Sequence, residues 1–310
     1  MNLKISKKWI RSKIITDNFL KINSIAFPGN ETYFCTGSSD SMIYLWDTIN
    51  CKKISILSGH RGTITKMLFD KKSGNLISGS EDMNIFLWDV KYEKTLRIFR
   101  GHTSAVNCID IHPILNVLVS GSRDNTIRFW DLRMKKEILI IKHHKNQICS
   151  VLFNCESPHL ISSSKDSEVC LWDLISFKCV NRLILHKDIV KDIKLHPSEL
   201  RFASLCSQTL NMWRLDGIFM KKIRIFEKIS FFSFKNKNEF VTIDNSGLMK
   251  FFSLENKTFV RNPYYQFYPF SQKLVCKPLT LEFNHKYSTF IMSSENGKIG
   301  IFREKWSLET

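Results

Sequence analysis

Apolar and polar residues alternate along the chain in short runs that are separated by turn residues. The segments KMLFD (66–70), NLISGS (75–80) and NIFLWDV (84–90) are typical of the whole sequence. Ser, Asp, Asn and Gly interrupt these runs roughly every 8–12 positions, which is the pattern of short antiparallel strands rather than of amphipathic helices. The pattern therefore predicts an all-β protein.

One segment recurs at a fixed interval. SSDSMIYLWD, SEDMNIFLWD, SRDNTIRFWD and SKDSEVCLWD each end in Trp-Asp, and their tryptophans follow one another at steps of 42 residues. A fifth tryptophan follows at a step of 41, and two weaker units carry phenylalanine at this position. Four predicted strands per unit, with Gly-His near one end and Trp-Asp near the other, describe a WD40 β-propeller blade. The seven markers are Trp46, Trp88, Trp130, Trp172, Trp213, Phe252 and Phe302.

Seven such units account for nearly the whole chain, so we expect residues 1–310 to form a single seven-bladed WD40 β-propeller domain. A propeller ring closes when a strand from one end of the chain completes the blade at the other end, which leaves few exposed strand edges. The segment KKWIRSKIIT (7–16) is the candidate outer strand of the blade that contains Phe302. The predicted ring is thus closed by an N-terminal strand.

A histidine, a serine and an aspartate recur before the tryptophan in three units, the histidine 28 residues and the aspartate six residues upstream. A single copy would suggest a Ser-His-Asp hydrolase, but equal sets around a ring suit a repeated folding unit better. As in WD40 proteins, we expect a hydrogen-bonded relay from Asp to His to Ser to the indole N–H, with no catalytic residues and no enzymatic activity. The sets are His60, Ser78, Asp82 and Trp88; His102, Ser120, Asp124 and Trp130; and His144, Ser162, Asp166 and Trp172.

Two further units carry altered sets. A structural arrangement that is repeated in several blades tolerates such changes, whereas an active site does not. They are Asn18, Thr36, Asp40 and Trp46 in the first unit, and His186, Ser204, Gln208 and Trp213, with Gln208 at the Asp position, in the fifth.

Metal and cofactor motifs are missing from the sequence. The nine cysteines are scattered, no C-x-x-C occurs, and most lie in apolar runs typical of core residues in a reducing compartment. His143 and His144 are adjacent, and adjacent residues point to different sides of a strand or loop. We therefore expect no metal site, no cofactor and no small-molecule substrate.

The net charge of +17 is the strongest compositional feature. It favours acidic protein surfaces or polyanions as partners, although an AT-rich genome that favours lysine codons explains the composition equally well. The basic N-terminus lacks the apolar stretch of a secretory signal, and no segment is long and apolar enough to span a membrane. No membrane partner is expected.

In propellers, partners bind mostly at the face where the turns before the third strands and the loops leading into each blade emerge. The residues before the turn aspartates, together with those in the leading loops, include five basic side chains, which predict contact with acidic segments or phosphates. The alternative is that these side chains are merely solvated. The five are Arg61, Arg123, Lys145, Lys165 and Lys187.

An aromatic stretch lies between Phe252 and Phe302, where the spacing is 50 rather than 42 residues. Tyr264, Tyr265 and Phe267 belong to it. Two interpretations stay open: a long loop between blades that packs on the side of the propeller, or an exposed patch that anchors a partner peptide.

The segments IHPILNVLVSGSRD and LHPSELRFAS, with others in the same order over residues 8–304, resemble the pleiotropic regulator family of WD40-repeat pre-mRNA splicing factors. The resemblance implies a non-catalytic platform in the nineteen-associated assembly of the spliceosome. Its partners would be other spliceosomal proteins, with RNA close by or contacted indirectly, and it would act in the nucleus. The narrower expectation is the nucleomorph of a reduced endosymbiont genome.

In the family, basic positions match Arg123, Arg128 and Arg133, which the resemblance makes candidate contacts to splicing proteins or nearby RNA. We expect the protein to lack the long N-terminal extension of the family, and the family's Ser/Gly-rich segment before the last blade is replaced by the aromatic stretch. Two alternatives remain: a WD40 subunit of a ubiquitin ligase or chromatin complex, and a propeller that binds RNA directly.

Overall fold

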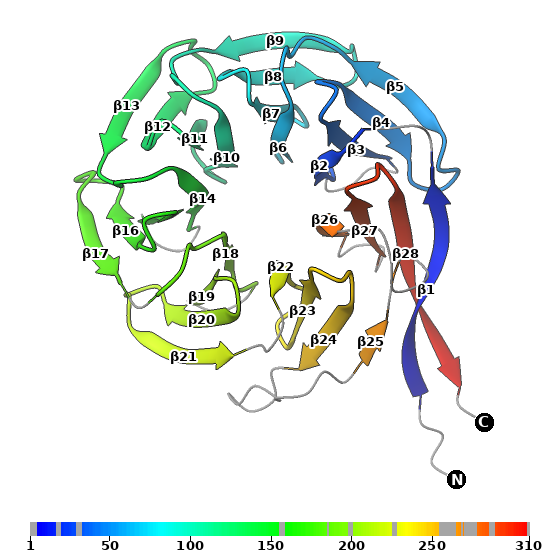
Figure 1. Cartoon of the computed structure of the whole chain (residues 1–310). Coiled ribbons are helices and arrows are strands. Elements are labelled where there is room, and N and C mark those ends of the chain that lie inside the picture. The colour runs from blue at the N-terminus through cyan, green and yellow to red at the C-terminus, as the bar shows by residue number, and fades with distance from the viewer. Residues whose placement is uncertain are drawn as a thin grey trace.

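The computed structural model describes residues 5–16, 20–28, 33–154, 159–184, 186–197, 201–224, 228–253, 265–267, 269, 278–284 and 289–308. Within these residues all regular elements are β-strands, which form seven four-stranded antiparallel sheets. The sheets are arranged as blades around a central opening (Figure 1). The all-β, seven-bladed prediction is confirmed. Across this part of the chain no helix is long and apolar enough to cross a membrane.

The first strand of each blade lies beside the central opening, and the second strand pairs with it (Figure 1). The first strands are β2 (Ile22–Ala26), β6 (Ile64–Phe69), β10 (Val106–Ile111), β14 (Ile148–Phe153), β18 (Asp192–Leu195), β22 (Ile229–Phe234) and β26 (Pro278–Asn284). The second strands are β3 (Tyr33–Ser38), β7 (Leu76–Ser80), β11 (Val117–Ser122), β15 (His159–Ser164), β19 (Arg201–Leu205), β23 (Glu239–Asp244) and β27 (Thr289–Ser294).

The third strand of each blade carries the marker Trp or Phe, and the fourth forms the outer edge of the ring. The third strands are β4 (Ile43–Asp47), β8 (Ile85–Asp89), β12 (Thr126–Asp131), β16 (Val169–Asp173), β20 (Thr209–Arg214), β24 (Met249–Ser253) and β28 (Ile299–Leu308). The fourth strands are β5 (Lys53–Leu57), β9 (Lys94–Phe99), β13 (Glu137–Lys142), β17 (Cys179–Leu183), β21 (Phe219–Arg224), β25 (Tyr265–Phe267) and, in the last blade, β1 (Ile5–Ile15).

The hydrophobic core lies between neighbouring blades. Trp88 of the second blade, for example, packs in one cluster with Cys35 and Leu45 of the first. Both faces of the inner strands are therefore covered, which explains why β7 is buried along its whole length. All seven marker residues are buried. Because each core is shared by two blades, no blade buries its apolar surface alone.

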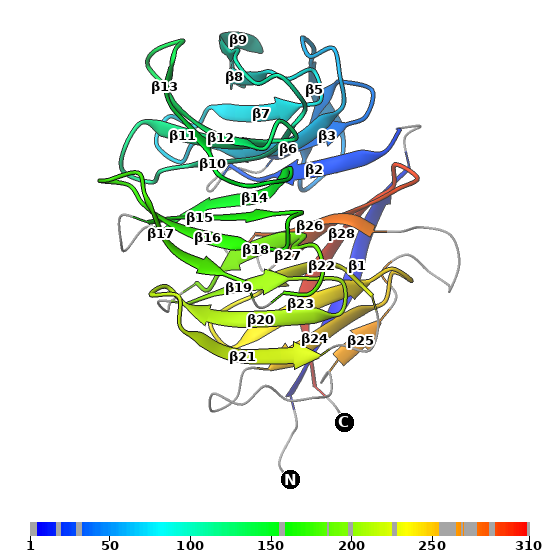
Figure 2. The same ribbon diagram turned by 60° about the vertical axis from the view of Figure 1, so that its left-hand side comes forward.

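The N-terminal strand closes the ring. β1 pairs antiparallel with β28, with Arg11 opposite Phe302, so that the last blade is built from both ends of the chain. The two strands run side by side in both views (Figures 1 and 2). Across the seam, Trp46 packs with Ile301, and the hydroxyl of Ser293 donates a hydrogen bond to the carbonyl oxygen of Ile22 at 2.9 Å. The predicted closing strand is confirmed.

Candidate interaction rim

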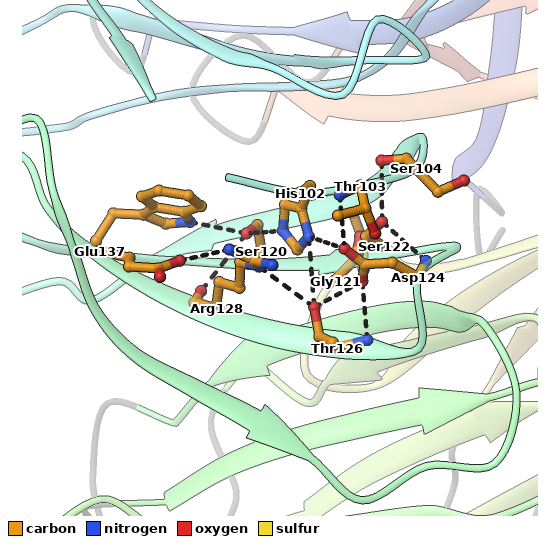
Figure 3. Close-up of polar contacts among 12 residues, drawn as sticks. His102, Thr103, Ser104, Ser120, Gly121, Ser122, Asp124, Thr126, Arg128 and Glu137 are labelled. Atoms are coloured by element: carbon orange, nitrogen blue, oxygen red, sulfur yellow. Dashed lines mark hydrogen bonds and ion pairs between the residues drawn. The ribbon is translucent and has the colours of Figure 1, made fainter. Parts of the chain in front are cut away.

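The structure brings the three predicted sets of four residues together, and the third blade illustrates them (Figure 3). His102 lies in the loop leading into the blade, Ser120 in β11, Asp124 in the β11–β12 turn and Trp130 in β12. Trp130 Nε1 donates to Ser120 Oγ at 2.8 Å, and His102 Nε2 lies 2.7 Å from the same oxygen. His102 Nδ1 lies 2.8 Å from Asp124 Oδ2. Since the carboxylate only accepts, Nδ1 is the donor, and Nε2 accepts from the serine hydroxyl.

The other two sets have the same geometry. The His–Asp distances are 2.7 Å in the second blade and 2.9 Å in the fourth, and the indole N–H donates to the serine oxygen at 2.8 Å in both. Ser78, Ser120 and Ser162 are completely buried. A buried serine hydroxyl that accepts from an indole cannot reach a substrate carbonyl. The arrangement therefore holds the strands and the leading loop of its own blade together, and we call each such set of His, Ser, Asp and Trp a lock.

Each aspartate also accepts hydrogen bonds from groups other than the histidine. Asp82 Oδ2 also accepts from the backbone N–H of Arg61 at 2.9 Å, and Asp166 Oδ2 from that of Lys145 at 3.0 Å. Burial alone raises the pKa of Asp82, but the hydrogen bonds from His60 and from the Arg61 N–H outweigh it and lower the pKa to about 2. The charged carboxylate thus fixes the leading loop on which these basic residues lie.

The altered set of the first blade keeps the predicted contact between the tryptophan and the threonine. In the first blade Trp46 Nε1 donates to Thr36 Oγ1 at 2.9 Å, and the Tyr44 hydroxyl donates to Asp40 Oδ2 at 2.6 Å. Asn18, the predicted equivalent of the histidine, lies outside the described residues. A tyrosine hydroxyl therefore holds the turn aspartate of this blade.

In the fifth blade His186 and Trp213 both contact Ser204 Oγ, at 2.7 Å each. Gln208 does not occupy the aspartate position, contrary to the alignment, and its side chain is exposed. The turn is one residue shorter than in the second to fourth blades, which carries Gln208 away from the histidine. Cys206 Sγ contacts His186 Nδ1 in its place.

The five basic residues predicted for the rim are all exposed, and all belong to the leading loops or the turns between second and third strands. Arg123 forms an ion pair with Glu81 of the neighbouring blade at 2.8 Å. Lys165 forms no ion pair with any described residue. The rim is formed by Arg61, Arg123, Lys145, Lys165 and Lys187.

A recess of about 460 Å³ opens on this rim across the third, fourth and fifth blades. Three cations line it and no acidic side chain does, so it suits a negatively charged ligand. Lys191 Nζ donates to the carbonyl oxygen of Ile229 at 3.0 Å. The lining residues are Asn107, Arg123, Gln147, Cys149, Lys165, Ile189 and Lys191.

Of the lining residues, Arg123 and Lys165 were predicted from the sequence and the others were not. One signal was present: Thr65, Asn107, Cys149 and Lys191 recur at the same 42-residue step. Several side chains at this position donate to the first strand of the next blade, as Asn107 does to the Ile148 carbonyl oxygen at 2.8 Å. The repeated position therefore links neighbouring blades while it lines the opening.

The three arginines of GSRDNTIRFWDLR lie in different surroundings. Only Arg123 lines the recess. Arg128 was predicted to contact partners, but its side chain is only 9% exposed and forms an ion pair with Glu137, so it is not accessible on this surface (Figure 3). Arg133 is exposed and pairs with Asp131 at 2.9 Å, but it follows the opposite end of β12 from the rim. The three arginines therefore do not share one surface, and the contacts predicted for Arg123 and Arg133 stay predictions.

The aromatic stretch contributes a strand rather than only a loop. Tyr265 and Phe267 belong to β25, the fourth strand of the sixth blade, where they lie opposite Phe251 and Met249 of β24. Tyr264 lies outside the described residues. The role of this stretch in partner binding stays a prediction.

One side-chain cluster was not expected. His143, Cys170 and Cys179, from the leading loop, β16 and β17, place their potential ligand atoms within 4.8 Å of one another. Spacing along the sequence did not reveal it, because the three residues come from three different segments.

Among known families, the one described as WD domain, G-beta repeat matches residues 12–47, 51–89, 93–131 and 135–173. These residues include the units with the clearest Trp-Asp pairs. No curated protein matches the chain.

Proposed function

The chain belongs to the WD40-repeat family, and from this premise we propose that it is a non-catalytic scaffold of the spliceosome that supports pre-mRNA splicing through protein–protein contacts. A seven-bladed WD40 propeller is a platform for protein interaction. The observation that carries the proposal is the recess on the rim, where Arg123, Lys165 and Lys191 surround a space without acidic side chains. An acidic peptide segment of another spliceosomal protein is the partner that this charge favours.

The link to splicing depends on the resemblance of particular segments. IHPILNVLVSGSRD (111–124), one of the more specific of them, ends at Arg123, which lines the recess, and at Asp124, which holds the adjacent leading loop. One of the segments that carry the resemblance to splicing factors thus runs directly to the proposed contact surface. We propose the nucleus as the location, and the nucleomorph as its narrower form.

The test is affinity purification of the tagged full-length chain, followed by mass spectrometry of the bound proteins. We expect spliceosomal proteins with the wild type and their loss with the double variant Arg123→Glu/Lys165→Glu. The matched control is Lys178→Glu, which reverses an exposed charge in the β16–β17 turn, at the opposite end of the fourth blade. Recovery of a ubiquitin ligase or chromatin complex, or of no splicing proteins, would contradict the proposal.

Direct binding of RNA is the competing function, and the net charge of +17 favours it. The recess argues for protein instead, because none of its lining residues is aromatic and bases are usually held by stacking on aromatic side chains. The discriminating measurement is binding of purified protein to single-stranded RNA over a range of salt concentrations. Tight binding without partner proteins, with a steep dependence on salt, would favour RNA as the ligand.

A further inference from the structure

The cluster of His143, Cys170 and Cys179 combines an imidazole with two thiols at the outer side of the fourth blade. Cys170 is completely buried, Cys179 is half-buried and His143 is exposed, so the cluster is open to solvent on one side. The neighbouring His144 is engaged with Asp166 and Ser162, whereas the ring of His143 lies edge-on to Trp172 at 5.1 Å. His143 is therefore the histidine that can serve as a ligand.

The equivalent positions of other blades hold different groups. The three positions are the residue before the lock histidine, the residue two before the marker tryptophan, and the residue opposite that tryptophan on the fourth strand. In the third blade the last two positions form the Arg128–Glu137 ion pair. The sets are Gly59, Phe86 and Thr95 in the second blade, Gly101, Arg128 and Glu137 in the third, and His143, Cys170 and Cys179 in the fourth.

The space available for the side chain of His143 depends on the size of the side chain at position 170. A Cβ added at Gly101 would lie 2.7 Å from the Arg128 guanidinium and 3.0 Å from the indole of Trp130, so a long side chain two residues before the tryptophan requires glycine here. Cys170, much smaller than the Arg128 or Phe86 of the other blades, leaves room for the ring of His143. The fourth blade has changed two positions of one small region together.

The strand register disfavours a disulfide between the two cysteines. Cys179 lies opposite Trp172, two residues along the strand from Cys170 and on the same face. Residues in such a diagonal pair have Cα atoms about 7–8 Å apart, whereas a disulfide usually needs roughly 4.4–6.8 Å. The sulfur atoms lie within 4.8 Å of each other, but a pair at this diagonal spacing does not favour an unstrained disulfide, and both cysteines are free.

We propose that His143, Cys170 and Cys179 form a tetrahedral site for Zn²⁺, whose fourth ligand is a water molecule or a side chain of a partner protein. A tetrahedral zinc ion with bonds of about 2.0–2.3 Å holds two sulfur ligands, or a sulfur and a nitrogen, about 3.6–3.8 Å apart. The three potential ligand atoms lie within 4.8 Å of one another, so approaches of about 1 Å or less bring them to these separations. Thiolate and imidazole ligands bind zinc in preference to harder divalent cations such as Mg²⁺ and Ca²⁺.

The charges of the site balance when the ion binds. Burial raises the pKa of both the Cys170 and the Cys179 thiols, so without a cation they stay protonated. Coordination replaces the two thiol protons, which leave to solvent, and the two thiolates neutralise the double positive charge. Arg182, which lies opposite Cys170, is held by the carboxylate of Glu168 at 2.6 Å.

Cobalt titration of the reduced full-length chain tests the site, because Co²⁺ in place of Zn²⁺ gives thiolate charge-transfer and tetrahedral ligand-field absorption. We expect one Co²⁺ per chain, displaced by Zn²⁺. Loss of one ligand, in Cys179→Ser or His143→Gly, should weaken binding by at least about 100-fold. His143→Gly restores the glycine that two other blades carry, so this variant should fold normally.

The matched control is Cys149→Ser, which removes a half-buried cysteine of the same blade away from the cluster. It should leave the cobalt spectrum unchanged. Absence of thiolate-to-cobalt absorption in the wild type, or equal weakening in Cys149→Ser and Cys179→Ser, would overturn the proposal. So would a protein isolated two hydrogens lighter than its sequence, if peptide mapping joined Cys170 to Cys179.

Discussion

The histidine joins the turn aspartate to the buried serine within a blade, and its loss should be costly. His102→Ala leaves the oxygens of Ser120 and Asp124 without the ring between them. Each buried polar group that loses its partner costs about 1–3 kcal/mol, so we expect the free energy of unfolding to fall by about 2–4 kcal/mol. Thermal and denaturant unfolding measure it. Thr103→Ala is the control, because Thr103 is exposed and only its backbone N–H reaches Asp124.

His186 should make stability depend on pH. Burial, with a smaller effect of Lys222, lowers its pKa to about 4, whereas an unfolded chain has about 6.5. Since the unfolded state binds the proton more tightly, this contribution is complete above pH 6.5 and is lost as the pH falls towards 4. The loss is on the order of 3 kcal/mol.

Unfolding temperatures of the wild type and of His186→Gln, measured between pH 7 and 4, check this expectation. The wild type should lose stability relative to the variant as the solution is acidified. A difference between the two proteins that stays constant over this range would show that His186 does not titrate on unfolding.

Single residues were predictable from the sequence where they repeat. The lock residues of three blades recur at fixed spacing, and the structure brings each set together. Gln208 was misplaced because a turn shortened by one residue changes which side chain faces the histidine. The burial of Arg128 was missed because it depends on Glu137 of the next strand, and spacing along the chain contains no information about such pairs.

At the scale of elements, the turns between second and third strands carry a residue with positive φ. Ser41, Met83, Asn125 and Ser167 all adopt it, with φ between 64° and 70°. Only asparagine among these four is commonly found in that conformation. Met83 is also 45% exposed, so little packing depends on its side chain.

Met83→Asn should therefore stabilise the protein by about 0.5–1 kcal/mol, because asparagine relieves the cost of positive φ. The unfolding midpoint in denaturant measures the change. Lys165→Asn in the equivalent turn of the fourth blade is the control, since Lys165 does not have positive φ and forms no ion pair with any described residue, so the substitution should not stabilise. Equal effects of the two substitutions would contradict the role assigned to backbone conformation.

The strands were predictable where apolar runs end in Trp-Asp, and β25 was not. Its residues lie in a segment whose aromatic residues surround two prolines, which indicates a loop. What makes Tyr265–Phe267 a strand is the open edge of β24, which needs a pairing partner. That edge exists only after the sixth blade has folded, so a local pattern could not predict it.

At the scale of the whole molecule, the positive charge is not spread evenly. Among the first strands, Lys66 lies 3.8 Å from Glu282, and Lys194 lies 3.8 Å from Asp192. These strands thus pair cations with carboxylates. The recess on the rim is lined by three cations and by no acidic side chain, and of the three only Arg123 forms an ion pair with a described residue, Glu81, which lies outside the lining. The net charge could be predicted from the composition. The position of the three cations in the recess could not, because it depends on how three blades are arranged in space.

Ring closure is the property of the whole molecule that a single change tests most directly. β1 pairs with β28 over most of its length, and Ile15 is buried at the seam. Deletion of residues 1–15 removes the outer strand of the last blade and leaves β28 as an unpaired edge, which favours aggregation. We expect the unfolding temperature to fall by on the order of 10 °C, with oligomers in size-exclusion chromatography.

Deletion of residues 1–4 alone is the control, because it stops before the first residue of β1. A synthetic peptide of residues 5–16, added in excess to the shortened chain, should restore stability in proportion to the logarithm of its concentration, since it binds only the folded ring. If the two shortened chains unfolded at the same temperature, β1 would not stabilise the ring. The seven blades would then hold together without a strand from the N-terminal end of the chain in the last blade.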